Sequence, residues 1–182
     1  MIKNVVEDKK CTGCYCCKDA CPAGAIELSE NEDGFREAGV NDTICIQCGK
    51  CLEVCPVAHD ENRKAYDVSS YAFRACDEVR KTASSGGVVP VAASVILQKQ
   101  GVVCGVQLTP DLKAQYIVID QVEDIAKING SKYIQADATG IYRKIKTLLL
   151  EGKTVLFTGL PCQTAGLYNL SLIHISEPTR PY

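Results

Sequence analysis

Two runs of four cysteines occupy the first third of this 182-residue chain and share one spacing. Within each run the cysteines are separated by two, two and three residues, and a proline follows the fourth one. Thiolates are soft ligands, and this spacing is typical of 4Fe-4S cluster binding. The pattern therefore predicts single-electron chemistry at two clusters. The runs are Cys11, Cys14, Cys17, Cys21 and Cys45, Cys48, Cys51, Cys55.

The fourth cysteine of each run is expected to cross over to the other cluster. Three thiolates spaced two apart on a tight loop grip three irons of a cube, whereas the fourth lies one helical turn further on and points away. This is the pattern of bacterial dicluster ferredoxins. Cluster 1 is therefore assigned to Cys11, Cys14, Cys17 and Cys55, and cluster 2 to Cys45, Cys48, Cys51 and Cys21.

Two other uses of cysteine fit less well. Structural zinc is bound by two separated pairs rather than by two equal runs of four. Disulfides are unexpected because nothing in the sequence suggests secretion. Cys16 breaks the spacing, so we interpret it as a buried thiol beside the cluster and not as a ligand.

Composition and charge narrow the class of protein. The chain carries 20 Lys and Arg against 22 Asp and Glu, with no basic block, which argues against nucleic acid as a partner. The charged N-terminal residues do not form a secretory signal, and Ser, Gly, Pro and Gln interrupt the uncharged stretches, so no membrane span is expected. Twelve cysteines in this setting indicate a cytoplasmic protein that uses them for metal or catalysis.

The elements beyond the cysteine runs alternate between strands and helices. Residues 58–70 are polar and are interpreted as a linker that includes a solvated His59. Strands are expected at 102–106, 116–119 and 155–157, with a turn at 109–111. Helices are expected at 87–100, 123–128 and 140–151. The first of these would bury Val88, Val91, Val95 and Ile96, and the last Ile141, Ile145, Leu148 and Leu149. The fold class is α+β: a ferredoxin-like dicluster module followed by an incomplete α/β domain.

Three loops of the second region have the composition of ligand loops. Ser84, Ser85, Gly86 and Gly87 open a predicted helix, where backbone N–H groups receive phosphate, although the same residues also cap helices without a ligand. Gly130, Ser131, Lys132 and Tyr133 combine small residues with a cation and an aromatic ring. The third loop, 158–163, follows a strand. No Gly-x-Gly-x-x-Gly motif occurs, and Gly152-Lys153-Thr154 precedes its strand instead of following it, unlike a P-loop.

In order and spacing, five segments resemble the beta-subunit family of coenzyme F-420 hydrogenase/dehydrogenase. They are Tyr71-Ala72, Glu78-Val79-Arg80, Ser84-Ser85-Gly86-Gly87, Gly130-Ser131-Lys132-Tyr133 and Gly159-Leu160-Pro161-Cys162-Gln163. The resemblance covers residues 1–169, since many bacterial members carry a dicluster module in front. It implies an FAD site lined by the Ser84–Gly87 and Gly130–Tyr133 loops. It also implies that Cys162 is a ligand of a third cluster whose other ligands lie further downstream.

The end of the sequence suggests an artificial tail. Residues 170–182 are similar to the translation of a sequencing adapter, so we expect a truncated protein and discard His174 as a site residue. Cys76 and Cys104 are interpreted as isolated core thiols. The expected domains are 1–57 for the cluster module and 71–169 for the beta-subunit-like domain.

Two functional hypotheses follow. In the first, the chain is an oxidoreductase subunit that relays electrons between the clusters, FAD and a two-electron acceptor such as a deazaflavin, together with a redox partner protein. In the second, it is a ferredoxin-type electron carrier whose second domain only docks a partner. A bound flavin separates the two, because it adds structured absorption bands to the broad absorption of the clusters.

Overall fold

The computed structural model describes residues 2–59 and 69–172. Most of the predicted linker lies outside the described residues, and so do residues 173–182 of the expected adapter segment at 170–182, including His174. The chain divides into two compact units. The first comprises Met1–Arg63 together with Leu160–Tyr182, and the second comprises Lys64–Gly159. The domain boundaries at 57, 71 and 169 stay predictions, but the helix that begins at Pro161 belongs to the first unit.

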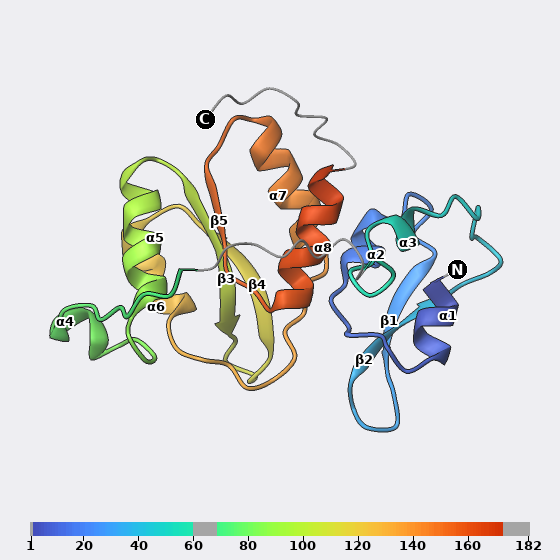
Figure 1. Cartoon of the computed structure of the whole chain (residues 1–182), viewed down its shortest axis with the longest axis horizontal. Helices are drawn as coiled ribbons and strands as arrows, with labels where there is room; N and C mark the ends of the chain where they lie inside the picture. The colour runs from blue at the N-terminus through green and yellow to red at the C-terminus, as the bar shows by residue number, and fades with distance from the viewer. Residues whose placement is uncertain (1, 60–68, 173–182) are drawn as a thin grey trace. The chain divides into compact units, whose positions relative to one another are not determined.

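In its described residues, the first unit contains a β-hairpin and four helices, whose labels are given in Figure 1. Strands β1 (Ile26–Glu30) and β2 (Arg36–Val40) pair antiparallel, with Ile26 opposite Val40. Its core includes Ile2, Tyr15, Ala38 and Val54, each no more than 5% exposed. The helices are α1 (Ile2–Glu7), α2 (Cys16–Ala20), α3 (Lys50–Glu53) and α8 (Pro161–Leu172).

The two cysteine runs repeat the same backbone conformation. Tyr15 and Gly49 occupy equivalent positions in the runs, and both adopt left-handed φ angles, of 69° and 78°, immediately before α2 and α3. The residues two positions earlier, Gly13 and Gln47, are also left-handed, with φ angles of 60° and 53°. Such turns reverse the chain within a few residues, so each run wraps around one point. This repeat is the structural counterpart of the shared cysteine spacing.

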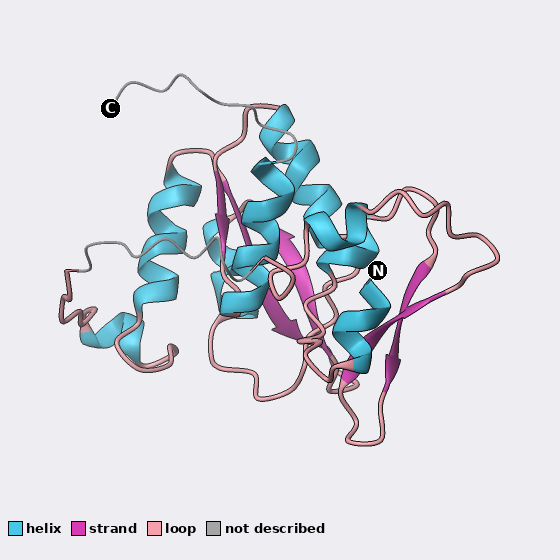
Figure 2. Cartoon of the chain, turned by 45° about the vertical axis from the view of Figure 1, so that its right-hand side comes forward, coloured by secondary structure: helices cyan, strands magenta, loops and turns pink. Residues whose placement is uncertain are grey.

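The second unit is built on a three-stranded sheet with the order β4-β3-β5. Figure 2 draws its strands as magenta arrows, as it does those of the first unit. The strands are β3 (Val102–Leu108), β4 (Ala114–Ile119) and β5 (Val155–Phe157). β3 pairs antiparallel with β4 and parallel with β5. The helices are α4 (Asp77–Arg80), α5 (Val88–Gln98), the 3-10 turn η2 (Val122–Asp124), α6 (Ile125–Ile128) and α7 (Ile141–Leu150). The predicted strands and helices are confirmed, and so is the α+β class.

The apolar face expected for α5 is wrong in part, although Ile96 packs against the core as expected. Val88 and Val95 are 58% and 46% exposed, whereas Pro90, Ala93 and Leu97 are buried. Ala93 and Leu97 pack in a core that also contains Val103 of β3. Because nearly every residue of this helix is apolar, the apolar periodicity does not define one face. The small side chain of Ala93 lets the helix approach the sheet closely, and this decides the orientation.

Helix α7 follows its prediction in part. Ile141 and Ile145 are buried as expected, but Leu149 is 39% exposed. Tyr142 takes the remaining buried position and lies against Phe157 of β5, with ring centroids 6.2 Å apart. Among the helices of the described residues, none is long and apolar enough to cross a membrane.

Candidate functional site

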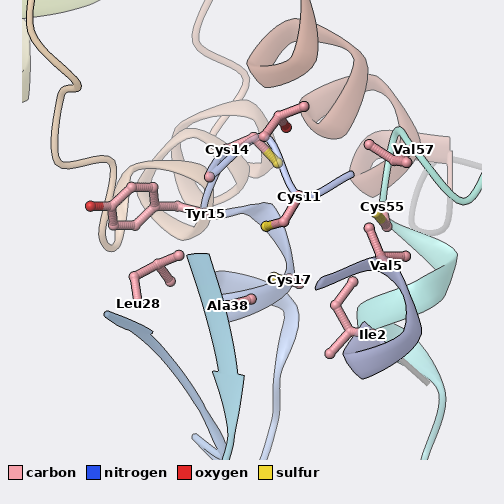
Figure 3. A pocket seen from close by; sticks show the side chains of 12 residues that line it. Ile2, Val5, Cys11, Cys14, Tyr15, Cys17, Leu28, Ala38, Cys55 and Val57 are labelled. Carbon is pink, nitrogen blue, oxygen red and sulfur yellow. The ribbon is translucent and has the colours of Figure 1, made fainter. Parts of the chain in front are cut away.

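The four cysteines assigned to cluster 1 line one pocket of the first unit (Figure 3). Cys11 and Cys14 come from the loop before α2, Cys17 comes from α2, and Cys55 follows α3. The pocket has ≈ 330 Å³ of space free of protein atoms, open solvent included. Apolar side chains complete its wall, among them Ile2, Val5, Leu28, Ala38 and Val57. A thiolate donor set with an apolar wall suits an iron-sulfur cube.

The four cysteines assigned to cluster 2 line a second pocket. Cys21, the last cysteine of the first run, lies there with Cys45, Cys48 and Cys51 of the second run. This pocket has ≈ 550 Å³ of space free of protein atoms, open solvent included. The backbone N–H of Ala25 donates to Cys21 Sγ at 3.3 Å, as is common around cluster sulfurs. Each pocket thus draws three cysteines from one run and one cysteine from the other.

The cysteines surround these pockets and do not converge on one point. Among the described residues, no three Cys, His, Asp or Glu side chains form a group that could hold a single metal ion. A 4Fe-4S cube contains several metal atoms, so its ligands must stand around a cavity. Four thiols line each pocket, which is the donor set that a 4Fe-4S cube needs, so the residues at both pockets fit a cluster. The cysteine assignments stay predictions.

The two sets of cysteines differ in exposure. Cys14, Cys17 and Cys55 of the first set are at most 9% exposed. In the second set, Cys48 is exposed and the other three are half-buried. Burial raises the pKa of the Cys14 thiol to about 11 and also raises that of Cys17, with the neighbouring thiols adding to the effect. Iron binding at the first pocket must therefore release protons from these thiols.

Helix α8 carries Cys162 and begins at the Leu-Pro-Cys-Gln segment. Pro161 is the first helical residue, where its missing N–H costs nothing. The buried Gln163 side chain accepts a hydrogen bond from the Leu160 backbone N–H at 2.8 Å, which is half of a capping box. Pro161 and Gln163 thus build the helix start, and Cys162 lies half-buried in its first turn. Burial and the nearby Cys162 thiol both raise the pKa of Cys14, whereas a hydrogen bond from the Cys16 backbone N–H lowers it.

The two loops assigned to FAD come together in the second unit. The backbone N–H of Ser131 donates to the Ser84 hydroxyl at 2.9 Å. Gly87, which directly precedes α5, has a φ of 77°, and Gly130 has a φ of 81°. The Tyr133 ring is 94% exposed. The structure therefore brings both loops to one place, but it does not test whether a flavin binds there.

Lys132 and Gly86 serve contacts within the protein. Lys132 Nζ donates to the Asn129 carbonyl at 2.6 Å, and burial lowers the pKa of this lysine. A methyl group added at Gly86 would lie 2.6 Å from the Phe73 carbonyl oxygen, and the Gly86 carbonyl accepts from the Ala75 N–H at 2.9 Å. Gly86 is thus needed for close packing of two backbone segments. The left-handed Ser85, with a φ of 54°, shapes the turn beside it.

Two polar atoms next to these loops were missed as candidate site atoms. Arg80 Nε and Asn129 Oδ1 are buried and make no hydrogen bond within the described part of the chain. Arg80 packs near Gly87, since a methyl group at Gly87 would lie 3.6 Å from Arg80 Cγ, and Asn129 directly precedes Gly130. A buried polar atom without a partner is costly, so each favours a ligand group or water nearby. Neither had a spacing signal of its own, although Arg80 lies in a segment that carries the family resemblance.

The matches to protein families cover both units. Residues 10–59 match the 4Fe-4S dicluster domain. Residues 70–141 match the N-terminal part of the beta subunit of coenzyme F-420 hydrogenase/dehydrogenase.

Three curated relatives have related redox names. A subunit of the F(420)H(2) dehydrogenase of Methanosarcina mazei is 23% identical over 89% of this chain and 49% of its own length. A subunit of the NADH-quinone oxidoreductase of Geobacter metallireducens is 34% identical over 34% of this chain and 51% of its own length. The ferredoxin-type protein NapF of Haemophilus influenzae is 41% identical over 24% of this chain and 25% of its own length.

The chain spans about half the length, or less, of these relatives. The predicted resemblance is confirmed, and the domain matches agree with the cysteine spacing. The chain therefore joins a segment that matches the 4Fe-4S dicluster domain to a segment that matches the N-terminal part of the coenzyme F-420 hydrogenase/dehydrogenase beta subunit.

Proposed function

We propose that the chain is part of an oxidoreductase subunit that relays electrons between two 4Fe-4S clusters and an FAD, and from there to a two-electron acceptor such as a deazaflavin. The observation that carries the proposal is the arrangement of the cysteines, because each predicted ligand set lines one pocket. Clusters transfer single electrons, whereas a flavin accepts one or two, so a chain that holds both converts one kind of transfer into the other.

The flavin part of the proposal rests on the paired loops of the second unit. The hydrogen bond from Ser131 to Ser84 fixes the two loops against each other. The Arg80 guanidinium lies beside the start of α5 and pairs through Nη1 with Asp77 at 3.3 Å. Its buried Nε is an unused donor for a phosphate or a flavin oxygen. Asn129 Oδ1 is an unused acceptor for an imide or hydroxyl group. These contacts support FAD as the ligand, with Tyr133 free to stack on a ring.

The partners and the compartment belong to the same proposal. A relay needs a redox partner protein at one end and a small-molecule hydride donor or acceptor at the other. The relative from Methanosarcina mazei is named as a subunit, which supports a partner protein within a complex. Cluster-binding thiols must stay reduced until iron binds, which supports a cytoplasmic location.

The first test is to measure metal and flavin in anaerobically reconstituted protein. We expect about eight irons and eight sulfides per chain, the content of two cubes. After addition of FAD and gel filtration, the chain, or a longer product of the same gene, should retain flavin with its structured absorption bands. Stoichiometric zinc with little iron would contradict the cluster assignment.

The flavin site itself is tested by Ser84→Ala, with Thr147→Ala as a control. Ser84→Ala removes the bond between the two loops without adding atoms. Thr147→Ala also removes an exposed hydroxyl from the second unit, but one that only donates to the Arg143 carbonyl in α7. Gly86→Asp is expected to abolish FAD binding by crowding and charge repulsion, yet it would also clash with the Phe73 backbone, so Ser84→Ala is the cleaner change. Full clusters without any flavin would favour the plain electron carrier.

A further inference from the structure

The two cysteine runs differ at one equivalent position. In the first run, the residue after the left-handed Tyr15 is Cys16, which is 0% exposed. In the second run, the residue after the left-handed Gly49 is Lys50, which is exposed. The residue at this position is buried in the first run and exposed in the second. This difference indicates that another part of the chain covers only the first run.

Helix α8 covers the first cysteine run at Cys16. The Cys16 thiol donates a hydrogen bond to the Gly166 carbonyl of α8 at 3.0 Å. The Asn169 side-chain amide donates to the Val54 carbonyl at 3.5 Å, next to Cys55. Gln163 and Gly166, three residues apart on one side of the helix, are buried in α8.

The approach of α8 is close enough to touch a predicted ligand. A methyl group on Gly166 would lie 2.9 Å from Cys16 Cβ, 3.1 Å from Cys16 Sγ and 3.9 Å from Cys14 Sγ. Only a residue without a side chain fits there. The Cys16 backbone N–H is also hydrogen-bonded to the Cys14 thiol, so Cys16 joins α8 to a ligand through both its main chain and its side chain.

We propose that α8 is a cover for cluster 1, that Cys16 and Gly166 are the positioning residues that hold it in place, and that the two clusters are inequivalent as a result. The proposal rests on the cluster assignment of the proposed function. Cluster 1 is shielded from solvent, whereas cluster 2, with the exposed Cys48, stays accessible to solutes. Solvent exposure is one of the factors that set the potential of a 4Fe-4S cluster.

The test measures iron release from the reconstituted, reduced chain to the ferrous chelator bathophenanthroline disulfonate. Wild-type protein should release iron in two phases, a fast one from cluster 2 and a slow one from cluster 1. Cys48→Ala, which removes cluster 2, should leave only the slow phase. Gly166→Ala should accelerate the slow phase about tenfold, which equals ~1.4 kcal/mol in the opening of α8, within the usual cost of overpacking.

Gly39→Ala is the matched control for Gly166→Ala. It makes the same change in β2 of the same unit, but the new methyl group would meet only the Glu27 carbonyl oxygen at an ordinary 3.8 Å. Its two phases should match those of the wild type. Cys16→Ala should also accelerate the slow phase, and Cys16→Ser, which keeps a hydroxyl donor for Gly166, should restore part of the protection. If Gly166→Ala protein does not bind cluster 1, the comparison of Cys16→Ala with Cys16→Ser takes its place.

A second readout is the reduction potential of each cluster, followed by electron paramagnetic resonance. When the cover opens, water reaches cluster 1 and stabilises its reduced state, which is more negatively charged than its oxidised state. The reduction potential of cluster 1 should therefore rise in Gly166→Ala, whereas that of cluster 2 should stay unchanged. A single release phase in fully loaded wild type, or equal acceleration of both phases by Gly166→Ala, would overturn the cover. If the wild-type protein binds no iron, the proposed function is contradicted, and the proposal of a cover falls with it.

Discussion

Cys55 provides the sharpest test of the crossed ligand sets, because it belongs to the second run but lines the pocket of the first. Cys55→Ala is expected to destroy cluster 1 and to leave cluster 2, so the iron content should fall from about eight to about four per chain. A single substitution does not say which cluster was lost. Double variants identify the lost cluster, because two substitutions in the ligand set of one cluster remove no more iron than one substitution does.

The two double variants give opposite expectations. Cys14→Ala with Cys55→Ala removes two ligands of the same pocket and should still retain about four irons. Cys48→Ala with Cys55→Ala removes one ligand from each pocket, since Cys48 lines the other one, and should retain little iron. Iron and sulfide are measured after anaerobic reconstitution and gel filtration. The reverse order, with the Cys14 pair empty and the Cys48 pair half-loaded, would refute the crossover.

Three further predictions address the second unit, and a fourth the unused thiol of the first. Ser84→Ala should weaken FAD binding about two- to tenfold, which is the range for the loss of one exposed hydrogen bond. The affinity is measured by fluorescence titration, in which Thr147→Ala should keep the wild-type value. Leu97→Ala should lower the free energy of unfolding by ~2–5 kcal/mol, whereas Val95→Ala should change it by only ~0.5 kcal/mol because Val95 is exposed; equal effects in denaturant titrations would contradict the orientation of α5. Cys76 is exposed, so the expectation that it is a core thiol is wrong, whereas Cys104 is buried as expected. Iodoacetamide at pH 8 should therefore modify Cys76 but not Cys104, whose pKa burial raises to about 12; modification of Cys104 in folded protein, detected by peptide mass spectrometry, would contradict its burial. Cys16→Ala should keep the full iron content while Cys14→Ala loses one cluster, and equal iron loss would refute the register of the first run.

The predictable parts of this molecule depend on local spacing. The positions of Cys14 and Cys17 are set by a turn and one short helix, so the sequence alone indicates which cysteines gather together. The same holds for the strands at 102–108 and 114–119, because β-branched runs on both sides of a Thr-Pro-Asp turn predict a hairpin.

The unpredicted parts depend on packing between distant residues. The orientation of α5 is decided by Ala93 against the sheet, which an all-apolar helix does not reveal. The contact between Cys16 and Gly166 joins residues 150 positions apart, and no local pattern encodes it. The sequence carried one indirect signal of this contact. Cys16 occupies the position that Lys50 occupies in the second run, and a thiol is unusual where the equivalent residue is exposed to solvent. Cys162 was identified only through the family resemblance.

The placement of α8 in the first unit also affects the order of events during synthesis. The ribosome completes both cysteine runs early, but the helix that contacts Cys16 and Val54 is translated only after the whole second unit. Domains fold as units while the chain emerges, so a nascent chain presents its first cluster pocket before α8 is made. Iron-sulfur assembly factors therefore have a period of access to Cys14 that ends when residues 161–169 are made. Delivery of cluster 1 is easiest before α8 is translated, and pausing within the second unit would extend that period.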